Sequence, residues 1–209
     1  MIKSKLVELI KMRLGNRTDT GIDARIDTEL DAAQYELERF GVFTPWFLLS
    51  ETATYTTAAG ESRVPIPADM LQEYEEGALY YDGLPLTKHD QDYLSEFYHE
   101  SLPGAPRAYA LVGNYFVLYP VPDASYEISM KYYRADAVPS AVSVDAENLW
   151  MVYAADWLWS KTGQAIARFI KDPDAQQRFT EDESAASKRV YLQHVARAEI
   201  NSPRRKGDV

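Results

Sequence analysis

The sequence predicts an α+β protein in which helices from both chain ends form a discontinuous bundle around an inserted antiparallel β-domain. Residues 107–134 alternate apolar and aromatic side chains with small or polar ones, as in a half-buried sheet. Outside the β-rich region the apolar residues recur with helical periodicity. Because neither terminal pair of helices buries its apolar face alone, we expect the two ends to pack together. The predicted division is a helical bundle of residues 1–50 and 143–201, a β-domain of 51–142 and a flexible tail of 202–209.

Two helices are predicted in the first 41 residues. Lys3–Leu14 places leucines and an isoleucine on one face, and Gly15-Asn16 ends it. A second helix follows the candidate caps Asp19 and Thr20 and ends at Gly41. Its expected inward face consists of Ile22, Ile26, Leu30, Ala33, Leu37 and Phe40. The connector 44–49 then carries a Trp and a Phe that we expect to be buried.

Several short elements are expected in the first half of the β-domain. Strands at Thr52–Thr57 and Arg63–Ile66 flank a turn and form a ribbon, and Asp69–Gln72 reads as one helical turn. Asp82-Gly83 is a strong turn dipeptide, which predicts a hairpin between residues 74–81 and 85–88. A short helix, Asp90–His99, is expected to begin at Asp90 as its cap and to carry on one side Tyr93, Leu94, Phe97 and Tyr98.

Three strands and two helices complete the predicted chain. The strands are Arg107–Val112, Tyr115–Pro120 and Tyr126–Arg134, and Gly113-Asn114 makes a hairpin of the first two. A long helix over residues 146–170 is expected to follow the cap Asp145, with the inward residues Leu149, Trp150, Val152, Tyr153, Trp157, Leu158 and Ile166. The dipeptide Asp172-Pro173 offers a cap and a first helical residue for a last helix, which runs to about Ile200.

Charge is unevenly distributed along the 209 residues. The net charge is −10, and residues 51–100 hold 11 acidic against 2 basic residues, whereas residues 151–209 hold 8 against 10. A protein that binds DNA tightly needs an excess of basic residues, whereas this chain is acidic overall, so DNA binding is disfavoured. The chain has no Cys, which excludes a disulfide framework and thiolate metal sites. We also expect no membrane segment, because no apolar run approaches about 18 residues.

Candidate catalytic groups are sparse in the sequence. His89 and His99 lie among acidic residues, but the spacing of metal ligands exists only as Glu96 with His99 or Glu100, so a solvated acidic face is expected. The pair Glu75-Glu76 offers two carboxylates of the glycosidase kind, a combination that acidic loops often contain without catalysis. Glycines are scattered rather than clustered as in a phosphate-binding loop. We therefore predict no enzyme activity, no metal site and no cofactor.

Tyrosine is concentrated in the β-domain, where twelve of the fifteen Tyr residues lie. Most are expected in the sheet core, but the neighbours Tyr80 and Tyr81, and likewise Tyr132 and Tyr133, point to opposite faces of a strand. Some aromatic surface should therefore lie outside the core and serve as a protein interface. A sugar-binding platform is the main alternative use of such a surface.

The order of motifs resembles a known family. It comprises YYDG-x-PL from Tyr80, P-G-x-P-x-x-Y from Pro103, G-N-Y-x-x-L-Y-P-x-P from Gly113, the pair Tyr132-Tyr133 and N-L-W from Asn148. Over about residues 45–183 this order is similar to that of the head-to-tail adaptor (connector) proteins of short-tailed bacteriophages.

The resemblance implies a structural virion protein at the head–tail junction, assembled in the host cytoplasm. It implies a ring of twelve copies that binds the portal protein, carries the tail nozzle and fibre proteins, and lets DNA pass without specific binding. The basic tail residues Arg204, Arg205 and Lys206 match, by position and charge, the segments that reach onto the portal in such adaptors. Two alternatives stay open: a carbohydrate-recognition module on a virion or bacterial surface, and an uncharacterised hydrolase.

Overall fold

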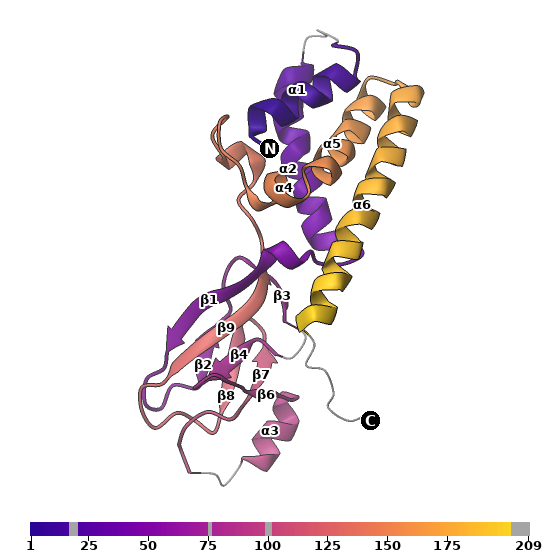
Figure 1. The fold of residues 1–209 in the computed structure, drawn as a ribbon. Coiled ribbons are helices and arrows are strands. Elements are labelled where there is room, and N and C mark those ends of the chain that lie inside the picture. Colours follow the sequence, from indigo (N-terminus) through magenta and orange to yellow (C-terminus); the bar gives the residue numbers. More distant parts are fainter. Residues whose placement is uncertain (17–20, 75–76, 99–101, 202–209) are drawn as a thin grey trace, which may run out of the picture. The chain divides into compact units, whose positions relative to one another are not determined.

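The computed structural model describes residues 1–16, 21–74, 77–98 and 102–201 (Figure 1). It divides into two compact units: unit 1 comprises Met1–Leu48 and Asp136–Val209, and unit 2 comprises Leu49–Ala135. Unit 1 is helical and unit 2 consists mainly of strands, so the predicted α+β class, with helices from both chain ends and a β-region between them, is confirmed. That the two regions are separate domains with borders at residues 50 and 142 stays a prediction.

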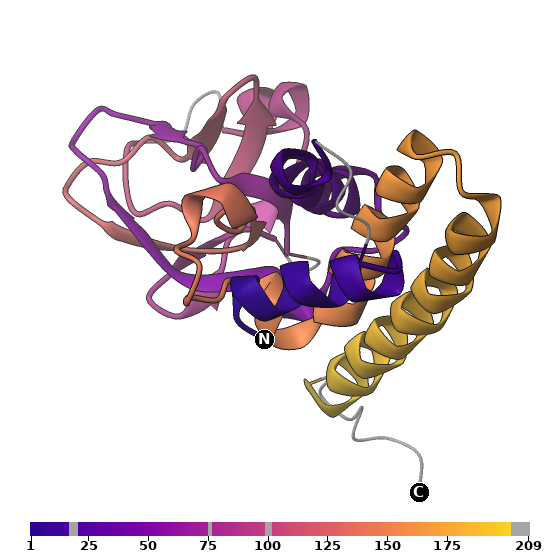
Figure 2. The ribbon, with the colours of Figure 1, turned by 90° about the horizontal axis from the view of Figure 1, so that it is seen from above.

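Unit 1 is built around one central helix. Its helices are α1 (Lys3–Arg13), α2 (Ile22–Phe40), α4 (Leu149–Tyr153), α5 (Ala155–Phe169) and α6 (Pro173–Asn201), with short 3-10 turns at Trp46–Leu48 and Pro139–Ala141. Helix α5 packs against α1, α2, α4 and α6. Both views show α6 running alongside α5 (Figures 1 and 2). Helices from the two chain ends therefore share one core.

The first two helices lie where the sequence predicts them, with one exception in the inward face of α2. The apolar positions from Ile22 to Leu37 are buried, but Phe40 is 75% exposed. Phe40 is the last residue of α2, and helical periodicity does not ensure that a neighbouring element reaches the end of a helix. The candidate caps Asp19 and Thr20 lie outside the described residues; Gly21, at a φ of 108°, occupies the N-cap position.

The prediction of a single long helix over residues 146–170 is wrong, because the structure has two helices there, α4 and α5. Helix α4 begins only at Leu149, because the side chain of Asn148, not of Asp145, accepts a hydrogen bond from the Met151 N–H at 2.9 Å. The helical path breaks at Ala154, whose φ and ψ are −140° and 35°. Trp150 and Trp157 are both buried, as expected of inward residues seven positions apart, and their ring centroids lie 5.8 Å apart. Two residues expected to face inward are instead exposed, Val152 and Tyr153.

Helix α6 begins as predicted. The Asp172 carboxylate accepts a hydrogen bond from the Ala175 N–H at 2.9 Å, and Pro173 is the first helical residue. Its buried side chains are spaced by four or seven residues and form one stripe: Ala175, Phe179, Ala186 and Val190. The other positions of the helix are mainly polar, apart from the exposed Tyr191 and Leu192, which suits an element covered on one side only.

A close approach between α5 and α6 depends on Gly163. A Cβ atom on this residue would lie 2.2 Å from the Phe179 ring, far inside van der Waals contact. Because the ring occupies the place of a side chain, α6 lies directly on the backbone of α5 at this point. Gly163 is therefore a packing residue rather than a flexible one.

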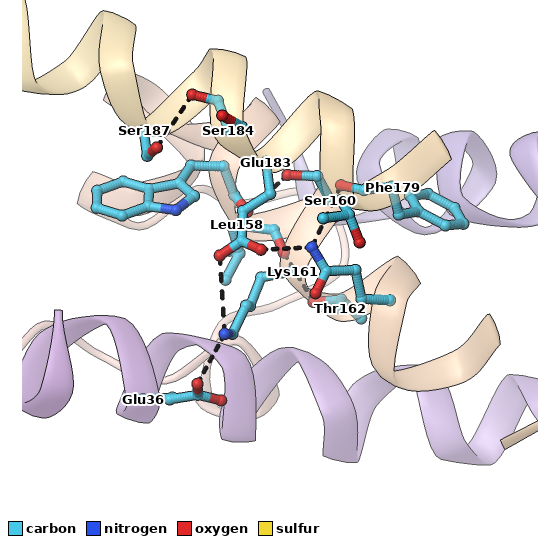
Figure 3. A network of polar contacts seen from close by, with 12 residues as sticks. Glu36, Leu158, Ser160, Lys161, Thr162, Phe179, Glu183, Ser184 and Ser187 are labelled. Atoms are coloured by element: carbon cyan, nitrogen blue, oxygen red, sulfur yellow. Dashed lines mark hydrogen bonds and ion pairs between the residues drawn. The ribbon is translucent and has the colours of Figure 1, made fainter. Parts of the chain in front are cut away.

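A polar network on the same side of α5 links three helices (Figure 3). Lys161 on α5 places its Nζ 2.7 Å from the Glu36 carboxylate on α2 and 3.7 Å from the Glu183 carboxylate on α6. Gln164 donates hydrogen bonds to Glu183 and to the Phe179 carbonyl. Lys161 is only partly exposed, so the two carboxylates balance its charge where α2 and α6 flank α5.

A partly buried carboxylate, that of Glu38, joins α2 to the chain that returns after unit 2. Oε1 of Glu38 accepts hydrogen bonds from the Trp150 indole N–H at 2.8 Å, the Gln34 amide at 2.9 Å and the Asp136 N–H at 3.2 Å. The Asn148 amide donates in turn to the Gln34 side chain at 2.8 Å. Burial raises the pKa of Glu38, and these hydrogen bonds to the charged form oppose that rise.

Unit 2 contains two sheets around one core. The strands are β1 (Leu49–Thr56), β2 (Arg63–Pro65), β3 (Met70–Glu73), β4 (Leu79–Tyr81), β5 (Leu84–Pro85), β6 (Thr87–Lys88), β7 (Ala108–Val112), β8 (Tyr115–Tyr119) and β9 (Glu127–Arg134). One sheet has the order β1-β9-β4-β5, with β3 also paired to β9; the other has the order β2-β8-β7-β6. Apolar residues of both sheets meet in one cluster that includes Val64, Leu79, Tyr109, Phe116 and Ile128.

The structure confirms two hairpins of unit 2 and corrects its other pairings. The turns at Asp82-Gly83 and Gly113-Asn114 join β4 to β5 and β7 to β8 as predicted. The strands β1 and β2 form no ribbon, because β1 pairs with β9 and β2 with β8. Residues 70–73 form strand β3 rather than a helical turn, and β6 pairs with β7 in parallel. These partners are distant in sequence, which local turn signals do not report.

We predict that Gly163→Ala destabilises the protein, although a glycine-to-alanine change inside a helix ordinarily stabilises it by up to about 1 kcal/mol. The added methyl group must displace the Phe179 ring, which we expect to cost about 1–3 kcal/mol net. Urea unfolding measures the change. Phe179→Leu in the Gly163→Ala background should recover part of the loss, and a stabilised single variant would contradict the packing described.

We predict that Glu38→Ala costs about 2–3 kcal/mol of unfolding free energy, because the buried Trp150 indole N–H loses its acceptor. Glu38→Gln keeps an acceptor oxygen and removes a charge whose burial is unfavourable, so its cost should stay below about 1 kcal/mol. Chemical denaturation at neutral pH compares the two variants. Equal losses would mean that the charge itself, rather than the acceptor, holds the network.

Candidate interaction surfaces

The described residues contain no group of three or more His, Cys, Asp or Glu side chains placed to hold a metal ion. His89 lies 4.8 Å from the Tyr93 ring, centroid to centroid, while His99, Glu100 and the pair Glu75-Glu76 lie outside the described residues. His194 packs beside Phe43 at 5.5 Å. In the described parts of the chain, no helix is both long and apolar enough to cross a membrane.

The two units differ in charge. Unit 2 has 13 acidic and 5 basic residues, a net charge of −8, while unit 1 has 19 acidic and 17 basic residues, a net charge of −2. Most of the negative charge of the chain therefore belongs to the β-unit. A surface of this kind attracts basic partners and repels nucleic acid.

Neither ring of the pair Tyr132 and Tyr133 lies at the surface. The two residues are 4% and 6% exposed. The expectation that one ring of this pair lies outside the core is wrong, because β9 is paired on both sides and its two faces are both covered here. The Tyr132 hydroxyl donates to Asp69 at 3.0 Å, and the Tyr133 ring lies 6.4 Å from Tyr74.

The pair Tyr80 and Tyr81 is more accessible. Both side chains are half-buried, and Tyr81 packs edge-on against Tyr126 at 5.3 Å. Tyr80 lines a shallow hollow together with Ser129, Met130 and Lys131. The structure therefore leaves Tyr80 and Tyr81 partly accessible, in different surroundings, and Tyr132 and Tyr133 in the interior.

The most exposed aromatic surface of unit 2 lies on α3 (Gln91–Phe97). Of the residues expected on one side of this helix, Leu94 is buried, whereas Tyr93 and Phe97 are 53% and 65% exposed. The two rings stack with an angle of 15° between their planes. Asp90 stands at the N-cap, but its side chain makes no capping hydrogen bond.

A hollow of about 170 Å³ opens beside these rings, between α3 and strands β6 and β7. We call it the α3 hollow, and its walls include His89, Tyr93, Phe97, Tyr98 and Arg107. The exposed carboxylates Asp92 and Glu96 belong to the same helix. The hollow combines aromatic walls with the polar residues His89 and Arg107, and exposed aromatic side chains of this kind are typical of a protein-binding surface.

Unit 1 has a comparable exposed patch at the end of α2. We call it the 35–42 patch, and it consists of Tyr35, Arg39, Phe40 and Val42. Phe40 is 75% exposed and Val42 is 99% exposed. The Tyr35 ring lies 6.3 Å from Phe40, and the Arg39 guanidinium lies 4.8 Å from the Tyr35 ring centroid. Large apolar groups grouped in this way commonly mark an interaction site.

Comparison with known families assigns the chain. Residues 4–207 match the family model described as SU10 adaptor protein. The chain belongs to the SU10 adaptor protein family. The resemblance to phage head-to-tail adaptors is thereby confirmed, and the protein is a structural adaptor of bacteriophage virions. No curated protein matched the sequence.

The match covers both units, so the family assignment applies to both of them. An adaptor works through its surfaces, and the 35–42 patch and the α3 hollow are the candidate contact surfaces. The basic residues Arg204, Arg205 and Lys206 lie outside the described residues. The α3 aromatics were visible in the sequence as a pattern, but their exposure depends on which side of α3 the sheet covers.

We predict that Tyr93→Ala and Phe97→Ala each change the unfolding free energy of this adaptor by about 0.5 kcal/mol or less, because both side chains are mainly exposed. Leu94→Ala on the same helix should cost about 2–4 kcal/mol, since its side chain is buried. Thermal and urea unfolding of the three variants test this. A loss at Tyr93 or Phe97 as large as that at Leu94 would assign the two rings to the core.

Proposed function

We propose that this adaptor is one subunit of a ring of twelve copies that joins the portal to the tail nozzle and fibre proteins of a short-tailed phage. The ring continues the DNA channel from the head into the tail. The observation that carries the proposal is the family match over residues 4–207. Further support comes from the accessible aromatic surface on both units.

A ring requires heterologous contacts, in which one face of each subunit meets a different face of the next. The charge difference between a β-unit of −8 and a nearly neutral helical unit supports such a contact. The adaptor acts by shape and contact, without a reacting group, a metal or a cofactor of its own.

The basic residues Arg204, Arg205 and Lys206 are proposed to dock on the portal. They follow α6 at the C-terminal end of the chain and carry three positive charges within three residues. An acidic portal surface would attract them, and such contacts weaken as salt is added. Tyr80 and Tyr81 are the accessible pair of the candidate interface tyrosines.

Acidic residues of segment 51–100 are proposed to face the channel and repel DNA phosphates. Their support is the net charge of −9 in this segment, with 11 acidic and 2 basic residues. A lumen of that charge keeps the genome from adhering during ejection.

A second candidate function is carbohydrate recognition at the virion surface. The observation in its favour is the α3 hollow. A sugar bound there would contact the stacked Tyr93 and Phe97 rings and nearby polar groups. Glycan binding that Tyr93→Ala abolishes would favour this function over the ring.

We predict that the purified chain, mixed with portal dodecamers, forms a second ring stacked on the portal, which electron microscopy detects. A variant with Arg204→Glu, Arg205→Glu and Lys206→Glu should occupy far fewer portals, while its thermal unfolding matches the native chain. Neither protein should retard duplex DNA at physiological salt, because the chain is acidic overall. Portals that stay bare with the native chain would contradict the proposed function.

A further inference from the structure

Two surface features of this adaptor, one on each unit, are not used by the fold of the single chain. One is the 35–42 patch of unit 1, where Phe40 and Val42 flank Gly41 and are 75% and 99% exposed. The other is the α3 hollow of unit 2, a concave surface with aromatic walls. The first projects and the second recedes. Such a pair satisfies the requirement of a ring for two different, complementary surfaces on each subunit.

The two features match in shape and in the chemistry of their apolar groups. The α3 hollow has a volume of about 170 Å³, which suits a single large side chain, and Tyr93, Phe97 and Tyr98 contribute to its walls. A phenylalanine ring entering it meets other aromatic rings, and each such pair contributes about 0.5–1.5 kcal/mol beyond the area that it buries. Phe40 touches Tyr35 but is 75% exposed, so most of its ring is accessible for such a contact.

The two features also match in charge. Arg39 precedes Phe40 and lies over the Tyr35 ring, at the edge of the 35–42 patch. Asp92 and Glu96 are exposed on α3, each next in sequence to one of the two stacked rings. If Arg39 meets the α3 side of the hollow, its guanidinium faces these two carboxylates, whereas the opposite orientation would bring it toward Arg107 in the lining. The difference favours one register over the other.

We propose that Phe40 of one adaptor copy inserts into the α3 hollow of the next copy, with its Arg39 paired to Asp92 and Glu96 there. This inference rests on the proposed ring and names the surfaces that close it. The contact is heterologous, so each copy offers its 35–42 patch to one neighbour and its α3 hollow to the other.

The absence of Cys from the chain allows a direct test. We place one thiol at each surface, with Val42→Cys and Gln91→Cys in the same chain, so that Arg39, Phe40 and the lining of the α3 hollow are kept. A short bis-maleimide reagent added to portal-bound rings should then produce a ladder of cross-linked species beyond the dimer. Each single-Cys variant serves as the matched control and should stop at the dimer or monomer, because a chain with one thiol cannot extend a series.

Charge reversal tests the register of the contact independently. Arg39→Glu alone, or Asp92→Arg with Glu96→Arg, should reduce the number of ring-bearing portals about tenfold, and the combination of all three should restore it. Thermal unfolding of each purified variant confirms that the fold is intact. Failure of the combination to restore rings that both reversals remove would overturn the proposed pairing.

The outcomes separate this inference from the proposed function. Rings that form with the native chain, without a ladder in the double-Cys variant, overturn the inference and leave the ring in place. Portals that stay bare with the native chain overturn the proposed function, and this inference with it. Glycan binding in the α3 hollow, lost in Tyr93→Ala while ring assembly is kept, assigns the hollow to a sugar.

Discussion

In the helical unit, one partly buried carboxylate, that of Glu38, joins the two halves of the chain. The chain leaves unit 1 after Leu48 and returns at Asp136, so its two halves must be brought together by contacts between distant residues. Oε1 of Glu38 collects N–H groups from α2, from the first returning residue and from the Trp150 indole. These donors are directional, and they set the position of the returning chain along α2 more narrowly than apolar packing alone would.

Once the returning chain is placed, the rest of unit 1 follows from it. Asn148 donates a hydrogen bond to Gln34 and caps α4. After the break at Ala154, helix α5 runs through the centre of the bundle. Helix α6 can then lie directly on α5, because Gly163 leaves room for the Phe179 ring. The Lys161 network adds polar contacts to both flanking helices.

The fold leaves aromatic surface exposed where an adaptor needs contacts. Unit 2 buries the Tyr132 and Tyr133 rings but exposes Tyr93 and Phe97, and unit 1 exposes Phe40. An isolated chain gains little stability from these exposed rings. Their value lies in assembly, where the same apolar area is removed from water between chains and adds to the free energy of association.

The sequence by itself determined the α+β class, the extent of α1, α2 and α6, and the hairpins at Asp82-Gly83 and Gly113-Asn114. These features depend on local causes: helical periodicity, the Asp172-Pro173 cap and two-residue turns. Tertiary structure alone decided the division of the strands into two sheets, the break at Ala154 and the side of α3 that stays exposed. Each of these depends on partners far away in the chain, whose packing and hydrogen bonds override local preference.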